Sequence, residues 1–293
     1  MMPNEHRAFK LGLSAVMLWS TVATAFSISL RYLTPLQLVA LASAVSWCFL
    51  SLRLLQPARW QALRATAMRD RLFGLAMGWL NPALYYLVLF AAYDRLPAQE
   101  AMAINYSWGI TLALIAAPLL GQKLSLYSLL TSGISYFGIV VIATRGEQEA
   151  LNFAQPEGVA LALSSTLIWS LYWVINARKE IDPEVQLFLN FTGALPLLFA
   201  LVWYQGAAAP VSWQGWAGGL YVGLFEMGLA FVLWMGAMQA TRSTIRISSL
   251  IFLSPPVSLL FIWLIAGEAL RPYTLVGLLL ILLGLWLQRR ADI

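Results

Sequence analysis

Apolar residues occur in this chain as long continuous runs rather than as short alternating stretches. The runs are close to the ~20 residues that an α-helix needs to cross a bilayer core. Strands of a membrane barrel would instead alternate apolar and polar residues over about ten positions. The pattern therefore predicts transmembrane helices, whose backbone polar groups are satisfied within each helix. We expect ten of them, at 8–30, 35–55, 72–93, 98–120, 124–144, 158–177, 185–204, 213–239, 245–266 and 273–288.

The basic residues predict how these helices are oriented. Cytoplasmic segments of membrane proteins carry an excess of Lys and Arg. With the N-terminus in the cytoplasm, 14 of the 18 basic residues fall on inner segments, and the C-terminus is cytoplasmic too. The formal net charge of +5 is then a topology signal rather than a nucleic-acid-binding patch. The arginine-rich segment 57–71 is expected to lie along the inner membrane interface.

Composition supports a protein embedded in the lipid bilayer and argues against several other classes. Hydrophobic residues make up 60% of the chain and charged residues 11%, where a soluble domain is about 25% charged. A single cysteine, Cys48, excludes an intrachain disulfide, and a single histidine, His6, leaves no zinc site. We therefore expect no metal and no cofactor. No G-x-x-x-x-G-K-[ST] motif is present, so ATP is not the direct energy source. The predicted helices also contain no pair of carboxylates that could act in catalysis, which argues against an enzyme.

The chain contains a weak internal repeat. Leu18-Trp19-Ser20 matches Ile168-Trp169-Ser170 at an offset of 150. A second set of matches has an offset of 146: Tyr127, Leu129 and Gly138 with Tyr273, Leu275 and Gly284. These matches predict two five-helix repeats, at 1–148 and 149–293, which together form one transport domain. Because five is odd, the second repeat crosses the membrane in the opposite sense, an architecture that recurs in transporters.

Three features together resemble a known family: the ten helices in two repeats, the Trp-Ser pair in the first and sixth helices, and Gly267-Glu268 after the ninth. They are similar to the EamA-type drug/metabolite transporter superfamily over the whole chain. The resemblance implies a basket of helices around a central cavity, lined mainly by the third, fourth, eighth and ninth helices, with contributions from the first and sixth. It also implies a bacterial inner (plasma) membrane, and a monomer is compatible with it.

Within that superfamily, three short motifs are similar to those of aromatic amino acid exporters. They are 18–21 (Leu-Trp-Ser-Thr), 105–108 (Asn-Tyr-Ser-Trp) and 121–123 (Gly-Gln-Lys). Gly109 follows the second motif where those exporters have a proline. This departure bears on the range of substrates more than on the fold.

Glu226 is the strongest candidate for a functional side chain. It lies near the middle of a predicted helix, with no charged residue within ten positions on either side. An ionised carboxylate at the bilayer centre costs about 2.5–3.5 kcal/mol even on lenient insertion scales. We expect it to bind a substrate ammonium group or to carry a proton; the alternative is a protonated acid that bonds to a neighbouring helix. Gly219, Gly223 and Ala230 share its face, which either permits close helix packing or leaves room for a ligand.

Two pairs of polar and aromatic residues are further candidates for substrate binding. Asn81 precedes Pro82, which should kink its helix, and Asn81 and Tyr85 would share a face in a regular helix. Asn105 and Trp108, three positions apart in the next predicted helix, would also share a face. Asn and Tyr could bind the α-carboxylate and α-amino groups of an amino acid, and Trp could stack on its side chain. Interhelical hydrogen bonding is the equal alternative, and for Asn190, beside Gly193, packing is the expectation.

Ser254-Pro255-Pro256 interrupts the predicted ninth helix. Two adjacent prolines at membrane depth predict a broken helix beside the binding site, with Ser254 as a site residue; a structural kink is the alternative. Trp19, Trp169 and Trp173 are candidates for an aromatic cavity wall, which would suit apolar amino acids or flat organic cations. Trp203, Tyr204, Trp213, Trp216 and Trp286 fit an interfacial belt.

The remaining charged cluster, Asp94, Arg95 and Glu100, is expected at a solvated surface, with an outer gate ion pair as the alternative. The sequence as a whole predicts a secondary transporter that exports amino acids, aromatic and other apolar ones, by alternating access. Other small metabolites, such as purines or organic cations, are alternatives. Phosphorylated substrates are disfavoured because no Lys or Arg lies at midplane depth. A channel is a weaker hypothesis.

Overall fold

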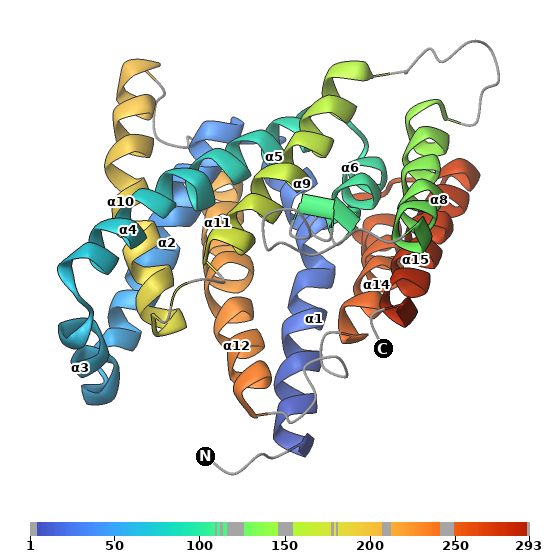
Figure 1. The fold of residues 1–293 in the computed structure, drawn as a ribbon. Helices are drawn as coiled ribbons and strands as arrows, with labels where there is room; N and C mark the ends of the chain where they lie inside the picture. Colours follow the sequence, from blue (N-terminus) through green and yellow to red (C-terminus); the bar gives the residue numbers. More distant parts are fainter. Residues whose placement is uncertain are drawn as a thin grey trace. The chain divides into compact units, whose positions relative to one another are not determined.

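The computed structural model of the 293-residue chain describes residues 5–108, 110–111, 114–115, 126–145, 155–176, 179, 181–206, 212–240 and 249–291. In these ranges all regular structure is helical (Figure 1). Six helical spans within them are long and apolar enough to cross a membrane, and three further apolar helices are shorter. The predicted fourth helix, 98–120, is described only in part.

The first helices form much as the sequence predicts. α1 spans Glu5–Ser29 and α2 spans Pro35–Leu54. α2 begins with a capping box, in which the Gln37 backbone N–H donates to Thr34 Oγ1 and the Thr34 N–H donates to Gln37 Oε1. α3 spans Pro57–Ala65 and has no buried residue; its place along the membrane interface stays a prediction. The cap and Pro35 explain why α2 starts where it does.

The predicted third helix is interrupted at its proline. α4 (Met68–Gly78) leads into a π-helical segment, η1 (Trp79–Leu84), and then into α5 (Tyr85–Arg95). Within η1, Asn81 has extended backbone angles of φ −146° and ψ 117°. Pro82 has no N–H to donate to the preceding turn, and the residue before a proline favours extended angles. The predicted kink is confirmed.

The middle of the chain contributes helices of regular α geometry. α6 spans Ala98–Asn105, α8 Leu126–Ala143, α9 Pro156–Asn176 and α10 Pro183–Tyr204. Asp182 caps α10, because its side chain accepts from the backbone N–H groups of Glu184 and Val185. The Gly-Gln-Lys motif at 121–123 lies outside the described residues.

The last helices are broken more than once. α11 (Trp213–Tyr221), the π-helical η2 (Val222–Leu229) and α12 (Ala230–Ala240) form one span. A 3₁₀ turn, η3 (Ser249–Leu253), precedes α14 (Ser254–Phe261), the π-helical η4 (Ile262–Ala266) and α15 (Pro272–Ala291). Pro255 and Pro256 occupy the first turn of α14, where a missing N–H costs little. The predicted break at Ser254 is confirmed.

The chain divides into two compact units, each built from both halves of the sequence. The first unit comprises Met1–Leu87 with Glu180–Phe261, and the second comprises Val88–Lys179 with Ile262–Ile293. The predicted boundary between residues 148 and 149 separates the two sequence repeats, and it does not coincide with a boundary of these units. The repeat boundary stays a prediction.

In the first unit, α2 packs against α10 in antiparallel orientation. Arg53, near the end of α2, pairs with Glu184 at the start of α10, while Trp47 Nε1 donates to Thr192 Oγ1 at 3.0 Å farther along. α4 packs against the same helix through glycine. A Cβ at Gly193 would overlap the Leu75 backbone, so only glycine permits this approach.

Asn190 lies at this α4–α10 contact. Its Oδ1 accepts a hydrogen bond from Gln186 Nε2 at 2.8 Å. Its backbone carbonyl occupies the space that a side chain at Gly78 would need. Asn190 thus takes part in the α4–α10 contact through its backbone, while its side-chain bond stays within α10.

In the second unit, α8 and α15 lie side by side and antiparallel (Figure 1). Tyr127 donates its hydroxyl to the Leu287 carbonyl, and Ser135 donates to the Ile281 carbonyl. A Cβ at Gly138 would meet the Gly277 carbonyl, and a Cβ at Gly284 would meet the Thr131 carbonyl. At the offset of 146, Gly138 corresponds to Gly284 and Thr131 corresponds to Gly277. The first of these two contacts therefore maps onto the second, and the two helices contact each other through corresponding positions.

Candidate functional site

Glu226 lies in η2, and its side chain is buried at 8% exposure. The hydroxyl of Tyr86, on α5, donates to Glu226 Oε1 at 3.1 Å. Glu226 Oε2 has no hydrogen-bond partner within the described residues. A buried polar atom without a partner is costly, so this oxygen is available to a proton or to a donor on a ligand.

The small residues near Glu226 serve packing. A Cβ at Gly219 would overlap Leu41, and a Cβ at Gly223 would overlap the Ala42 backbone, both on α2. Ser46, also on α2, donates to the Gly223 carbonyl at 2.6 Å. Of the two interpretations of the small-residue face, close helix packing applies at Gly219 and Gly223.

Asn81 is buried at the helix break, and its Oδ1 has no hydrogen-bond partner among the described residues. The extended backbone at Asn81 means that the helical four-residue relation to Tyr85 does not apply. Tyr85 is buried, and its ring meets that of Tyr86 edge-on, with 4.7 Å between centroids. Tyr86 is not among the site residues predicted from the sequence, although it belongs to the Tyr-Tyr pair that follows the kink.

Ser254 is fully buried at the start of α14 and accepts a hydrogen bond from Ser20 Oγ of α1, at 3.2 Å. Ser20 also contacts its own helix through the Val16 carbonyl. The neighbouring Trp19 is half-buried and packs against Phe231 and Trp234 of α12, with centroid distances of 5.7 and 5.3 Å. Trp19, Ser254 and Glu226 all belong to the first unit.

The remaining predicted site residues lie in the second unit. Asn105 Nδ2 donates to Ser165 Oγ of α9 at 3.0 Å. Trp108 and Trp173 each meet Trp169 edge-on, with centroid distances of 6.4 and 5.7 Å. All three Trp side chains are half-buried. Gly109, where the sequence departs from the exporters it resembles, lies outside the described residues.

The Trp-Ser pairs of the two repeats make corresponding contacts within their own units. Ser20 donates to Ser254, and Ser170 donates to the Trp108 carbonyl at 3.3 Å. The offset of 146 that relates Tyr127 to Tyr273 also relates Trp108 to Ser254. The two hydrogen bonds therefore join positions that the sequence matches pair.

The expectation of a solvated surface is wrong for Glu100. Its side chain is 3% exposed and forms an ion pair with Arg145 at 3.3 Å. Tyr273 donates its hydroxyl to the same carboxylate at 2.9 Å. Both partners are distant in the sequence, so hydropathy alone could not place them. Asp94 and Arg95 do lie at the surface, where Arg95 pairs with the exposed Glu157.

Gly267-Glu268 directly follows η4 in the chain and contacts the start of α6, in the same unit. Gly267 has a φ of +74°, which favours glycine. Glu268 Oε1 accepts from the Ala98 backbone N–H at 3.0 Å. Gln99, which follows Ala98 in α6, donates to the Ala269 carbonyl and accepts from the Arg271 N–H. Glu268 therefore caps the N-terminus of α6, whose own N-cap residue, Pro97, makes no side-chain cap.

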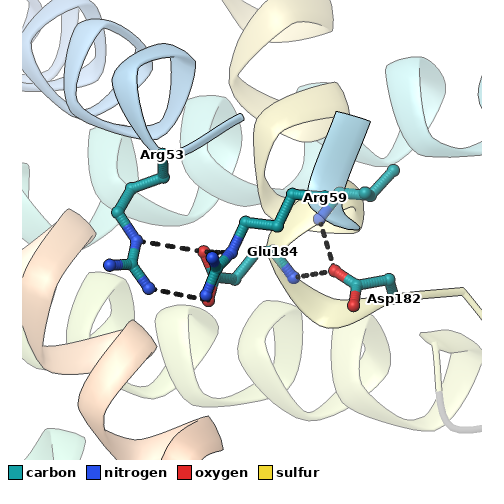
Figure 2. Close-up of polar contacts among 5 residues, drawn as sticks. Arg53, Arg59, Asp182 and Glu184 are labelled. Atoms are coloured by element: carbon teal, nitrogen blue, oxygen red, sulfur yellow. Dashed lines mark hydrogen bonds and ion pairs between the residues drawn. The ribbon is translucent and has the colours of Figure 1, made fainter. Parts of the chain in front are cut away.

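A second charge cluster, which no sequence pattern predicts, lies where α2, α3 and α10 meet (Figure 2). Arg53 Nε and Nη2 donate to the two carboxylate oxygens of Glu184 at 3.2 and 3.1 Å. Arg59 Nη2 donates to Glu184 Oε1 at 2.6 Å. Among the described residues, no group of three or more His, Cys, Asp or Glu side chains could hold a metal ion.

The described residues form six helical spans long and apolar enough to cross a membrane, with a buried acid in one of them and several half-buried aromatic side chains. The model of the EamA-like transporter family matches this chain twice, over residues 7–144 and 156–289. The chain belongs to the EamA-like transporter family. It is therefore a multi-pass membrane protein and not an enzyme. The two matches indicate that the chain consists of repeated halves.

Individual relatives add detail. The aromatic amino acid exporter YddG of Ancylobacter novellus is 27% identical over 271 residues, which cover 91% of each chain. A probable terminal-alkyne amino-acid exporter of Streptantibioticus cattleyicolor is 27% identical over 78% of this chain and 76% of its own. One solved crystal structure matches 99% of this chain and 100% of its own with a TM-score of 0.66 and 24% identity, a likeness of fold alone.

Proposed function

We propose that this protein is a secondary transporter that exports amino acids, with aromatic and other apolar ones as the main substrates, by alternating access. The observation that carries the proposal is the buried Glu226 carboxylate, which has one oxygen bonded to Tyr86 and the other without a partner among the described residues. An ammonium group is the complementary ligand, because it supplies both charge and donors.

The aromatic residues support an apolar side chain on the substrate. Trp19, in the same unit as Glu226, is half-buried. Aromatic rings provide large apolar contact areas and favourable edge-to-face geometry for another ring. Two relatives whose names describe amino acid export are consistent with this substrate class.

The architecture belongs to the same proposal: ten transmembrane helices as two inverted five-helix repeats, at 1–148 and 149–293, with both termini in the cytoplasm. The antiparallel pairs α2–α10 and α8–α15 support it, because each joins corresponding helices of the two repeats. Corresponding helices that run antiparallel are what an inverted repeat requires. We place the protein in a bacterial inner membrane.

Transport tests the proposal directly. The purified protein is reconstituted in liposomes, and uptake of radiolabelled phenylalanine is measured with competition by unlabelled amino acids and by a sugar phosphate. We expect saturable uptake that apolar amino acids inhibit and the sugar phosphate does not. Uptake no greater than that of empty liposomes would remove the amino acid assignment.

An organic cation is the second candidate substrate. Glu226 and the Trp side chains suit a flat cation, since ring faces attract positive charge. Phenethylamine retains the ammonium group and the ring of phenylalanine but lacks the carboxylate. Its inhibition of phenylalanine uptake would measure how much of the recognition a cation alone provides. A purine, a further alternative substrate, would bind without an ion pair to Glu226. A channel, the alternative mechanism, would give a flux that does not saturate as the substrate concentration rises.

A further inference from the structure

One side of the short helix α3 is attached to the first unit. Arg59 donates to the Glu184 carboxylate at the start of α10 (Figure 2). Leu63, four positions later and therefore on the same helical face, packs against a buried cluster that includes Leu54 and Val185. An ion pair and an apolar contact thus hold this face of α3 against α2 and α10.

The end of α3 is held by an arginine of the next helix. Arg71 Nη2 donates to the carbonyls of Leu63 and Arg64, and Arg71 Nε donates to the Thr66 carbonyl, each at 2.9 Å. Carbonyls in the last turn of a helix have no partner within the helix, so Arg71 supplies one. The corner between α3 and α4 is therefore fixed, and its outward side chains have a defined direction.

The other side of this corner is exposed and carries both apolar and basic side chains. Trp60 is 45% exposed, and the Arg64 guanidinium lies over its ring, 5.1 Å from the centroid. In the first turns of α4, Met68 and Leu72 are 65% and 58% exposed, and Arg69 between them is exposed too. Such a mixture is typical of a segment at a membrane interface.

Two of the arginines at this corner have no carboxylate to neutralise them among the described residues. Arg64 contacts the Trp60 ring, and the Arg69 side chain has no ion pair within the described part of the chain. Segment 57–71 contains four arginines and one acid, Asp70. Asp70 directly follows Arg69, and successive residues of a helix do not face each other. The exposed side of the corner is therefore positively charged.

We propose that this exposed side, named here the α3–α4 surface, binds the headgroup of an anionic phospholipid such as phosphatidylglycerol. The surface consists of Trp60, Arg64, Met68, Arg69 and Leu72. Guanidinium groups match phosphate in charge and in hydrogen-bond geometry, and Trp side chains favour the headgroup level of a bilayer. A zwitterionic lipid gains less, because its own cation offsets its phosphate. The proposal goes beyond the proposed function and does not depend on the substrate.

The test measures lipid binding to the purified full-length protein in a non-ionic detergent. Native mass spectrometry follows a titration with phosphatidylglycerol and a second one with phosphatidylcholine. Arg64→Gln and Arg69→Gln each remove one cation of the α3–α4 surface. Arg271→Gln is the matched control, because it removes one exposed arginine beside the 38%-exposed Leu270, but in the second unit.

We expect the wild type to bind phosphatidylglycerol more tightly than phosphatidylcholine. R64Q and R69Q should each weaken phosphatidylglycerol binding on the order of 5-fold, whereas R271Q should leave it unchanged. The preference for phosphatidylglycerol should also fall as salt rises from about 0.01 M to about 1 M, because the screening length shortens from about 30 to about 3 Å.

Equal affinity of the wild type for the two lipids would overturn the proposal. So would an effect of R271Q as large as those of R64Q and R69Q, since a general effect of net charge is the same in all three variants. Thermal unfolding in lipid-free detergent shows whether each variant is folded; if one unfolds, the other still decides. A protein that binds phosphatidylglycerol through Arg64 yet transports no amino acid would retain the lipid site and refute the proposed substrate.

Discussion

The Tyr86 hydroxyl and the Glu226 carboxylate, 140 positions apart in the chain, share a hydrogen bond of 3.1 Å inside the first unit. The bond joins the helix after the Asn81 break to the π-helical segment η2. It satisfies Oε1 only, so Glu226 is held in position by one oxygen and presents the other. Two irregular helices thus converge on the carboxylate that we expect to meet the substrate.

Tyr86→Phe should impair transport more than Tyr85→Phe. Removing the Tyr86 hydroxyl takes away the hydrogen bond to Glu226, and bonds to charged groups are worth about 1.5–3 kcal/mol. We expect the KM for phenylalanine in liposomes to rise by about 10-fold in Y86F. Y85F is the comparison variant, because among the described residues the tyrosine bond to Glu226 comes from Tyr86. A larger effect for Y85F would assign the site to the other tyrosine.

Glu226→Gln tests whether this acid carries a proton. Gln has nearly the same shape and can still accept from Tyr86, but it does not titrate. If Glu226 is the proton site, E226Q should abolish the pH dependence of uptake, and any remaining uptake should be flat with pH. Uptake measured from acidic to alkaline pH gives the answer. A pH dependence equal to that of the wild type would show that another group couples protons or that none does.

Gly277→Ala and Gly133→Ala should change stability in opposite directions. A Cβ at Gly277 would meet the Gly138 carbonyl and Ile142, whereas a Cβ at Gly133 has nothing within 4 Å. Overpacking of a tight contact costs about 1–3 kcal/mol, while Ala for Gly inside an exposed helix gains about 0.5–1 kcal/mol. Thermal unfolding in detergent measures both. Equal midpoints would mean that α8 and α15 pack less closely than described.

Glu268→Ala should destabilise the start of α6. The variant removes the acceptor of the Ala98 N–H, and loss of a cap costs about 1 kcal/mol. The midpoint of thermal unfolding should fall by about 2–4 °C. Glu157→Ala is the control: its side chain is 71% exposed and pairs with Arg95, and exposed pairs contribute about 0–1 kcal/mol. A shift in E157A as large as that in E268A would refute the capping role.

The sequence predicted the helices well because hydropathy is a local property. The described helices agree with the predicted spans to within a few residues at most ends, and Pro82 and Pro255 correctly predicted two interruptions. Trp203 and Trp213 are exposed, and their place in an interfacial belt stays a prediction. Each of these inferences needs only the side chain and its immediate neighbours along the chain.

Candidate site residues were harder to predict, because their roles depend on partners from distant segments. Glu226 was identifiable from its isolation in an apolar run, but Tyr86 was not distinguishable from Tyr85. The Asn81 break changed the relation between residues before and after it, so the face expected from a regular helix did not apply. Glu100 was expected at the surface, since nothing nearby in the sequence indicates that Arg145 and Tyr273 enclose it.

By itself, the sequence determined that this chain crosses the membrane many times, that it contains weak internal matches, and that one acid lies deep in an apolar helix. Only the tertiary structure decided that Tyr86 binds this acid, that Glu268 caps α6, and that Arg53 and Arg59 share Glu184. The reason is physical. The free energy of inserting an apolar run depends on its own residues, whereas a hydrogen bond or ion pair requires two groups within about 3–4 Å, and folding alone brings such groups together.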